Sequence, residues 1–399
     1  MKILILANKL PFPPRDGGSI ATLQMLLGLQ QTGNDLVCLA MNTSKHSFPL
    51  TSIPSDLKSK IRFLDVDINT SIRPLHLMIN LLFSNKPYIA QRFNKSVFRR
   101  ALVALLKEES FDLIQFEGPY LAAYLKDIRK NSTAKVSLRA HNLEHLIWQR
   151  MALNQGSPLK KWYLALLSRR LKKYELNLAH RVDCLVPISD KEKMYFMEQK
   201  IKTPMMTIAT GLNLDEYPLK NKASFSTLFF IGALDWLPNQ EGLSWFLDQV
   251  FNQLLKEAPG MHLHVAGRNP PAGFLEKLDH PNITFHGEVE DAKVFMQSYG
   301  IMVAPLFSGS GIRIKILEAM AMGTPVVTTS TGIEGIPAAK LPSVRVSDHP
   351  HEYKEHLLKL LKHPEEAGLM LEEARKLISR EFNILDLSKR LHQFYQAQA

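Results

Sequence analysis

The residues from Pro305 to Pro337 hold the most concentrated candidate chemistry of the chain. The run opens with a Gly/Ser turn, continues with apolar residues at helical spacing, and ends with a glycine and a proline before a β-branched segment. This order predicts a loop, a helix and a strand. The first N–H groups of such a helix lack partners within it and lie at the positive end of its dipole. We therefore expect Gly309, Ser310 and Gly311 to line a site for an anion.

Two cations and one carboxylate of the same helix fit an anionic ligand that also carries hydroxyl groups. Arg313 and Lys315 fall in the first turn, where a cation is disfavoured by the helix dipole unless an anion is bound there. Glu318 lies about a turn and a half further on, where its carboxylate can accept from paired hydroxyls of a ribose or another sugar. The alternative is a buried unit of helix and strand whose Arg and Lys point to solvent.

Two further candidate groups follow predicted strands. A Pro-rich turn and Gly17-Gly18 lie between the first predicted strand and a predicted helix from Ser19 to Gln31, with Ser19 as its N-cap. Glycines there let backbone approach a ligand, although a simple turn is an equal alternative. His141 follows the strand predicted over 134–140, where it is either a ligand group or the start of a helix.

Strand and helix patterns alternate along the whole chain. In the first half, strands are predicted over 2–8, 35–41, 61–66, 112–117, 134–140 and 182–188. In the second half, they are predicted over 228–234, 262–267, 283–285, 301–305 and 326–329, with helical patterns from 346 onward. The alternation predicts α/β domains with parallel, doubly wound sheets, in which ligands bind beyond the carboxyl ends of the strands. With 399 residues, two domains of similar size are expected.

The segment Leu317 to Val327 resembles the signature of a known enzyme family. Its sequence, LEAMAMGTPVV, is similar to the second half of the signature of retaining glycosyltransferases of family 4, which have the GT-B fold. The first Glu of that signature corresponds to Ser310, and Gly-Ser-Gly-x-Arg-x-Lys-x-Leu-Glu resembles a branch of the family. The resemblance implies two Rossmann-like domains facing a central cleft. It places an acceptor domain at 1–210, a nucleotide-sugar domain at 211–379, and a C-terminal helix crossing back to the first domain at 380–399.

The resemblance also assigns roles to residues of the first domain and to the ribose contact. His141 is implied to contact the transferred sugar and to act in catalysis, with Arg139 and Glu144 as supports and His145 as the alternative. Gly17 and Gly18 are implied to face the donor phosphate and the acceptor. The second Glu of the signature, which holds the nucleotide ribose, corresponds to Glu318.

The donor diphosphate needs cations that this chain supplies in an unusual way. Most family members carry an Arg and a Lys on the loop after Gly232, and this loop has neither. Arg268, Arg313 and Lys315 are the substitutes that the sequence offers, since bidentate Arg contacts to phosphate are strong and directional.

The implied reaction is transfer of a sugar from a nucleotide sugar to a hydroxyl of a glycan or lipid-linked acceptor, with retention at the anomeric carbon, in cell-surface polysaccharide biosynthesis. No metal, no cofactor and no pair of catalytic carboxylates is expected. Two alternatives remain. One is a nucleotide-sugar epimerase or phosphorylase on the same fold, and the other is a subunit that binds nucleotide sugar without turnover. A dehydrogenase is disfavoured because no Gly-x-Gly-x-x-Gly follows the first strand.

Composition limits the partners. The formal net charge is +11 and the pI is about 9.4, which suits nucleotide sugars, anionic lipid head groups or nucleic acid. Nucleic acid is disfavoured because the chain has neither zinc-finger spacing nor a long Lys/Arg block. The two cysteines lie in apolar strand-like runs, which is typical of buried thiols in a reducing compartment. A cytoplasmic protein is therefore expected.

One apolar run raises the question of a membrane. The uncharged residues 74–85 cover about half a bilayer span, so they cannot cross a bilayer as a helix. Together with the cations around them, they predict an interfacial basic face on the inner leaflet or, alternatively, amphipathic core helices with solvated charges. The cations concerned are Arg73, Lys86, Arg92, Lys95, Arg99 and Arg100.

Overall fold

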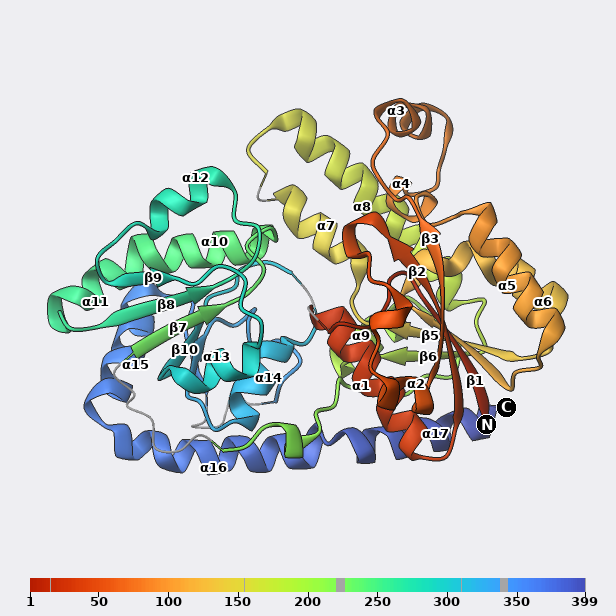
Figure 1. The fold of residues 1–399 in the computed structure, drawn as a ribbon. Helices are drawn as coiled ribbons and strands as arrows, with labels where there is room; N and C mark the ends of the chain where they lie inside the picture. The colour runs from red at the N-terminus through yellow and green to blue at the C-terminus, as the bar shows by residue number, and fades with distance from the viewer. Residues whose placement is uncertain (15, 154, 220–226, 310, 338–343, 399) are drawn as a thin grey trace. The chain divides into compact units, whose positions relative to one another are not determined.

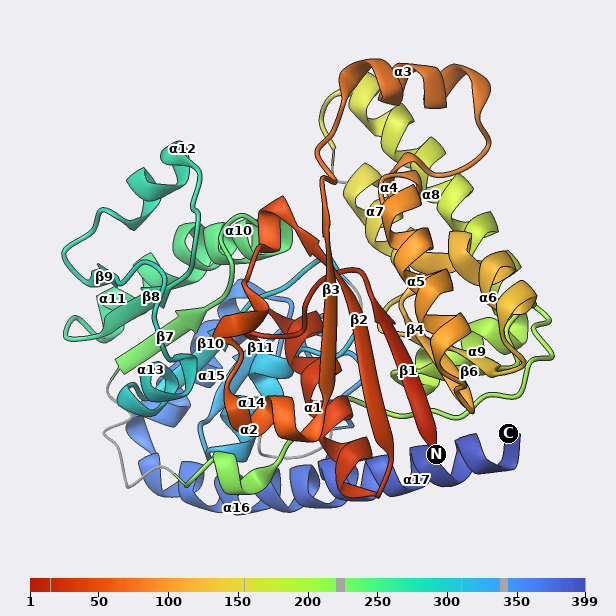
Figure 2. The ribbon, with the colours of Figure 1, turned by 45° about the vertical axis from the view of Figure 1, so that its right-hand side comes forward.

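The computed structural model describes residues 1–399 except 15, 154, 220–226, 310, 338–343 and 399, and leaves the side chains of 45 and 364–371 undescribed. The chain divides into two compact units. Unit 1 comprises Met1–Gly211 and Ile384–Ala399, and unit 2 comprises Leu212–Asn383. Figures 1 and 2 show the chain from two directions.

Unit 1 is a six-stranded parallel sheet with helices on both faces. Its strands are β1 (Lys2–Ala7), β2 (Asp35–Thr43), β3 (Arg62–Ile68), β4 (Leu113–Glu117), β5 (Lys135–Ala140) and β6 (Cys184–Pro187). Its helices are α1 (Gly17–Gln31), α2 (Ser55–Lys60), α3 (Pro74–Phe83), α4 (Tyr88–Gln91), α5 (Ser96–Glu108), α6 (Leu125–Asn131), α7 (Glu144–Leu153), α8 (Pro158–Ala179), α9 (Asp190–Glu198) and α17 (Ile384–Gln398).

The strand order in unit 1 is β3-β2-β1-β4-β5-β6. Side chains alternate along β1, so that Leu4 and Leu6 pack with α5 while Ile3 and Ile5 pack with α1 and α17. The contact of α17 with α1 is close, because a Cβ at Gly28 would fall 2.0 Å from the Ser388 hydroxyl. The order reverses between β1 and β4, which makes the ends of these two strands the expected ligand position of this sheet.

Unit 2 is a second six-stranded parallel sheet. Its strands are β7 (Thr227–Ile231), β8 (His262–Ala266), β9 (Ile283–Phe285), β10 (Ile301–Ala304), β11 (Val326–Thr328) and β12 (Val344–Val346). Its helices are α10 (Leu237–Trp245), α11 (Asn252–Glu257), α12 (Ala272–Leu275), α13 (Ala292–Ser298), α14 (Ile314–Ala321), α15 (Pro350–Lys362) and α16 (Pro364–Glu381). A π-helical segment, Phe246–Phe251, joins α10 to α11.

The strand order in unit 2 is β12-β11-β10-β7-β8-β9. Here the order reverses between β7 and β10, so the loops after these strands occupy the switch point. The core on one face of the sheet joins alternate residues of β7, β8 and β10 to apolar side chains of α10 and α15. The predicted fold class, α/β with two doubly wound parallel sheets, is confirmed.

Three local features differ from the sequence-based expectation. The first long helix begins at Gly17, because the Asp16 side chain accepts from the Ser19 N–H and makes Asp16 the N-cap, three residues before the predicted N-cap Ser19. The helix that the sequence predicts from about Pro119 to Arg129 begins as a 3₁₀ helix, Pro119–Tyr124, and continues as α6. The edge strand β12 was not predicted, since three residues carry too little periodicity to be recognised.

Among the described residues, no helix combines the length and the apolar character required to cross a membrane.

Candidate functional site

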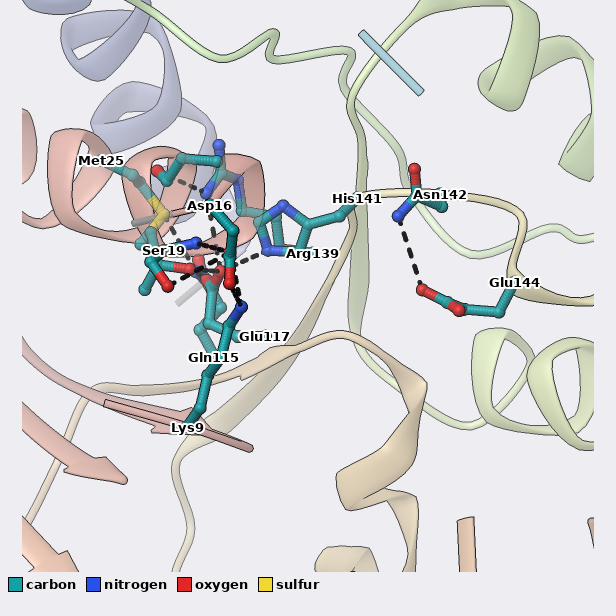
Figure 3. Close-up of polar contacts among 12 residues, drawn as sticks. Lys9, Asp16, Ser19, Met25, Gln115, Glu117, Arg139, His141, Asn142 and Glu144 are labelled. Atoms are coloured by element: carbon teal, nitrogen blue, oxygen red, sulfur yellow. Dashed lines mark hydrogen bonds and ion pairs between the residues drawn. The ribbon is translucent and has the colours of Figure 1, made fainter. Parts of the chain in front are cut away.

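The candidate site of unit 1 is built at the ends of β4 and β5. These parallel strands pair with Glu117 opposite Arg139, and the chain leaves β5 to reach His141 one residue beyond its end. The Nε2 atom of His141 lies 2.5 Å from a Glu117 carboxylate oxygen. The same oxygen accepts from the Thr22 hydroxyl at 2.8 Å and lies 3.6 Å from Arg139 Nη1. Figure 3 shows the imidazole pointing at this carboxylate.

Glu117 is buried, yet it is ionised. Burial by itself raises the pKa of this carboxyl, but His141, then Arg139, and hydrogen bonds from His141 and Thr22 together hold the pKa down at about 2. An ionised carboxylate only accepts hydrogen bonds, so His141 donates through Nε2. Glu117 therefore fixes both the orientation of the ring and the nitrogen that carries the proton.

Further polar contacts hold Arg139 and Glu117 in place. The buried Arg139 donates from Nη1 to the backbone carbonyl of Ala21 in α1 at 3.1 Å. Gln115 donates to Glu117 and accepts from Tyr395 of α17. The C-terminal helix thus contributes a hydroxyl to the network that orients His141.

The loop after β1 carries a charged pair at the same switch point. Lys9 Nζ lies 2.5 and 2.6 Å from the two carboxylate oxygens of Asp16. Burial raises the pKa of Asp16, but Lys9 outweighs it and brings the pKa to about 2. Gly17 and Gly18 directly follow Asp16 in sequence. They form the first turn of α1 and do not belong to the loop in which they were predicted. A Cβ on Gly18 would lie 3.5 Å from both the Asp16 carboxylate and Lys9 Nζ.

Of the two predicted supports of His141, Arg139 contacts Glu117, which is the partner of His141, whereas Glu144 has other partners. Arg139 is paired with Glu117, as described above. Glu144 instead accepts from Tyr120 at 2.6 Å, and Asn142 Nδ2 lies 3.5 Å from it. Burial, with Glu175 nearby, raises the pKa of Glu144 to about 7.

His145, the predicted alternative to His141, is buried between two partners. Its Nδ1 lies 2.6 Å from a Glu175 carboxylate oxygen and its Nε2 lies 2.8 Å from the Tyr195 hydroxyl. Glu175 also accepts from the His145 backbone N–H. These contacts join α7, α8 and α9, which is a packing role.

The predicted donor residues of unit 2 lie on loops that follow neighbouring strands. The loop after β7 begins at Gly232, whose carbonyl oxygen lies only 2.3 Å from where a Cβ of Gly267 would be. Arg268 follows β8, and its buried Nε has no hydrogen-bond partner among the described residues. The loop after β10 packs on α10, since a Cβ on Gly242 would lie 1.6 Å from the Pro305 carbonyl oxygen. The switch point therefore brings Gly232, Arg268 and the Gly/Ser turn to one edge of the sheet.

The Gly/Ser turn depends on backbone that other residues avoid. Gly309 has φ 104° and Gly311 has φ 81°, both in the left-handed region that glycine tolerates. Ser310, predicted to line the donor site, lies outside the described residues. Arg313 is the N-cap residue of α14, and its guanidinium carbon lies 5.7 Å from the centre of the Trp236 ring. A Cβ on Gly309 would meet both side chains.

Glu318 is buried and held by two partners of unit 2. It accepts from the Tyr217 hydroxyl at 3.0 Å, and Lys315 Nζ lies 2.8 Å from its other oxygen. Burial and then Glu318 raise the pKa of Tyr217 far above its usual value, so this hydroxyl is a donor. Arg375 links the segment of Tyr217 to α14, because it donates to the backbone carbonyls of Tyr217 and Ala321 at 2.7 and 2.6 Å. Lys315 is therefore bound within its own helix, while the Arg313 guanidinium lies next to Gly309.

Sequence reasoning missed Glu117, Lys9, Asp16 and Trp236. A signal existed for Glu117, because it ends a strand as His141 follows one, and parallel neighbours place such residues side by side. Lys9 and Asp16 frame the Pro-rich turn, but nothing in their spacing indicates that they pair. Tyr217 lies 101 positions from Glu318, so their contact has no local signal.

The fold is shared with solved glycosyltransferase structures. Alr3699/HepE of Anabaena, solved in complex with UDP, is 12% identical and covers 100% of both chains with a TM-score of 0.68. Sucrose-phosphate synthase from Thermosynechococcus elongatus is 15% identical and covers 100% of this chain and 99% of its own, with a TM-score of 0.72. These likenesses identify the fold as GT-B.

Sequence comparison adds two findings. Residues 226–363 match the family model described as "Glycosyl transferases group 1". An uncharacterized 44.6 kDa protein in the cps region of Klebsiella pneumoniae is 26% identical over 346 residues, which cover 84% of each chain. Together with the fold, these matches support a glycosyltransferase.

Proposed function

We propose that this protein is a retaining glycosyltransferase that moves a sugar from a nucleotide-sugar donor to a hydroxyl of a glycan or lipid-linked acceptor. The observation that carries the proposal is the switch point of unit 2. There Arg268 and the Gly/Ser turn follow neighbouring strands, and Arg313 and the buried Glu318 belong to the helix after the turn, all within the segment that matches group 1 glycosyl transferases. The cps-region relative favours polysaccharide biosynthesis as the setting.

The donor is held by unit 2 in this proposal. Its diphosphate lies against the Gly/Ser turn and the N-terminus of α14, where Arg313 and Arg268 supply positive charge. Glu318 accepts from the ribose hydroxyls. As the bond to the sugar breaks, negative charge grows on the leaving diphosphate, and fixed cations and N–H groups stabilise it without reorganisation. The residues named here require neither a metal nor a covalent intermediate.

His141 contacts the transferred sugar in this proposal. Since Nε2 donates to Glu117, the contact to the sugar is made by Nδ1 or by the backbone carbonyl. A carbonyl at this position would stabilise the positive charge that develops on an oxocarbenium-like sugar. The ionised Glu117 adds a compensating negative charge behind the ring.

A panel of nucleotide sugars tests the proposed reaction. We expect hydrolysis or transfer from one donor, with release of its nucleoside diphosphate and an α- or β-linkage that matches the donor. Conversion of the sugar without loss of the nucleotide would identify an epimerase instead. Binding of the donor without turnover, in the presence of glycan and lipid-linked acceptors, would identify a binding subunit.

Removal of the Arg313 side chain should weaken nucleotide binding. A charge-assisted hydrogen bond contributes about 1.5–3 kcal/mol, so we expect Arg313→Ala to raise the Kd for the nucleoside diphosphate by roughly 10- to 150-fold. Calorimetry measures this change. The control is Arg380→Ala, which removes an exposed arginine of α16 and should leave Kd unchanged. An unchanged Kd in Arg313→Ala would remove Arg313 from the donor site.

The ribose contact of Glu318 can be separated from its packing role by changing the ligand. We expect the wild-type protein to bind a 2′,3′-dideoxy nucleoside diphosphate about tenfold more weakly than the ribose form. In Glu318→Gln, which keeps the size of the side chain, this difference should shrink to about twofold or less. The control is Glu276→Gln, at an exposed position. Equal discrimination in Glu318→Gln and wild type would assign Glu318 to the Tyr217 and Lys315 contacts alone.

A further inference from the structure

Helix α3 buries a polar residue and exposes most of its large apolar side chains. Asn80 is its only buried residue, and the Asn80 amide donates to the Lys86 carbonyl at 3.0 Å and to Gln91 at 2.9 Å. Arg170 of α8 binds the same region, donating to Asn80 Oδ1 at 3.2 Å and to the Leu81 carbonyl at 3.0 Å. Polar contacts of a buried asparagine therefore anchor the helix, while most of its large apolar side chains remain exposed.

Large apolar side chains of α3 point to solvent. They are between 48% and 82% exposed, with Phe83 the most exposed. The residues are Leu75, Met78, Ile79, Leu82 and Phe83. Contiguous exposed apolar groups of this kind mark an interaction surface more often than scattered single residues do.

A second exposed apolar pair lies at the start of α8. Leu159 is 75% exposed and Trp162 is 54% exposed. Both views place the beginning of α8 and the whole of α3 at the same end of unit 1 (Figures 1 and 2). We call the exposed large apolar residues of α3 together with Leu159 and Trp162 the apolar tip.

The two segments that carry the apolar tip are basic and contain no acidic residue. Residues 68–107, which include α3, contain seven Lys and Arg and no Asp or Glu, and residues 145–174, which include most of α8, contain the same numbers. These two segments thus carry more positive charge than the whole chain, whose net charge is +11. Among these cations, the side chains of Arg73, Lys86, Lys160, Lys161, Arg169 and Lys173 are exposed.

Neighbouring cations of residues 68–107 affect the pKa of one of their members. Burial, and then the neighbouring Arg73 and Arg92, lower the pKa of Lys95. Positive potential therefore builds up beside α3 without carboxylates from its own segment to offset it.

We propose that the apolar tip and the exposed cations of these two segments dock the protein on an anionic lipid bilayer. Apolar side chains on a protruding helix can enter the boundary between head groups and acyl chains, while Lys and Arg around them contact the anionic head groups. A second copy of the chain is a poor occupant, because docking two such tips would bring two sets of cations together. The proposal does not rest on the transferase function, although it would bring a lipid-linked acceptor to the enzyme.

Vesicle sedimentation tests the proposal with the full-length protein and no donor or acceptor. We expect binding to vesicles of phosphatidylcholine with 30% phosphatidylglycerol, and at least about tenfold weaker binding to phosphatidylcholine alone. Binding to the anionic vesicles should fall as NaCl is raised from about 0.1 M to 1 M, because the Debye length shortens from about 10 to 3 Å.

Paired variants separate the apolar and the ionic contributions. Leu82→Ser/Phe83→Ser and Lys160→Glu/Lys161→Glu should each lower the partition coefficient by about tenfold or more. The matched controls are Leu275→Ser/Val294→Ser, at exposed apolar positions of unit 2, and Lys256→Glu, at an exposed lysine of α11. The controls should bind vesicles as the wild type does. All four variants change exposed side chains, and circular dichroism verifies that each is folded.

Two results would overturn the proposal. One is equal binding of the wild type, Leu82→Ser/Phe83→Ser and Lys160→Glu/Lys161→Glu to the anionic vesicles. The other is concentration-dependent dimerisation by light scattering that is abolished by Leu82→Ser/Phe83→Ser, with no vesicle binding by wild type, which would assign the tip to self-association. Vesicle binding by a protein that shows no transferase activity would leave this proposal standing and remove only the proposed reaction.

Discussion

Replacing His141 by alanine is expected to lower kcat by about 100-fold or more, with little change in the Kd for the nucleoside diphosphate. The separation follows from the placement of the groups. Arg268, Arg313 and Glu318, which we assign to the nucleotide, belong to unit 2, whereas His141 belongs to unit 1. A contact made only as the sugar departs affects turnover and leaves ground-state binding of the nucleotide intact.

The comparison requires kcat from a coupled assay and Kd from calorimetry on the same preparations. His180→Ala is the matched control, because His180 is an exposed histidine of the same unit, and it should retain wild-type turnover. Full activity in His141→Ala would return His141 to a structural role beside Glu117. A parallel loss of nucleotide binding would show that the substitution disturbs more than the sugar contact.

The sequence was sufficient to predict the fold and the sheet edges, at the carboxyl ends of the strands, where ligands are expected to bind. Long apolar runs separated by helical patterns specify parallel strands, because buried strands and amphipathic helices have different periods. The position of His141 could be predicted for the same reason, since it depends only on where one strand ends. The glycine turn before α14 was likewise recognisable, because Gly309 and Gly311 adopt backbone angles that few other residues tolerate.

The partners of the predicted residues could not be found in this way. Glu117 meets His141 only because β4 and β5 pair with a particular register, and Tyr217 meets Glu318 through tertiary packing. Such contacts join residues that are distant in sequence, and no local pattern records them. The start of α1 was misplaced because Asp16, Ser19 and the glycines between them all favour a helix start, and only the hydrogen bond of Asp16 decides between them.

Burial in α3 distinguishes two interpretations of the segment that contains this helix. The residues 74–100 fitted either a basic interfacial face or a pair of core helices with solvated charges. In a core helix the apolar residues would be buried, but in α3 the single buried residue is Asn80. The second alternative therefore does not describe α3, whereas α5 does bury Phe98 and Leu102 in the core.

Replacing Glu117 by glutamine is expected to lower kcat by about 100-fold while nucleotide binding is retained. Glutamine keeps the size of the side chain but removes the charge that orients His141 and pairs with Arg139. Glu117 acts through His141, so we treat it as a positioning residue. In the double variant Glu117→Gln/His141→Ala, the loss should be no larger than in His141→Ala alone.

The same substitution should change stability with a defined pH dependence. The pKa of Glu117 is about 2 in the folded protein against an ordinary value of 4.5, so the ionised group stabilises the fold above about pH 4.5, and this stabilisation is lost as the pH falls toward 2. At pH 7 we expect Glu117→Gln to reduce the local unfolding free energy of β4 and β5 by about 3 kcal/mol. The difference from wild type should narrow steadily below about pH 4.5.

Hydrogen–deuterium exchange of the β4 and β5 amides measures this local free energy without requiring the whole chain to unfold in one step. Glu108→Gln, at an exposed carboxylate of α5, is the control and should change neither the exchange nor kcat. A Glu117→Gln variant with reduced stability and normal kcat would make the Glu117 network purely structural. One with normal stability and low kcat would contradict the ion pair with Arg139 as a source of folding energy, while leaving the orientation of His141 as the function of Glu117.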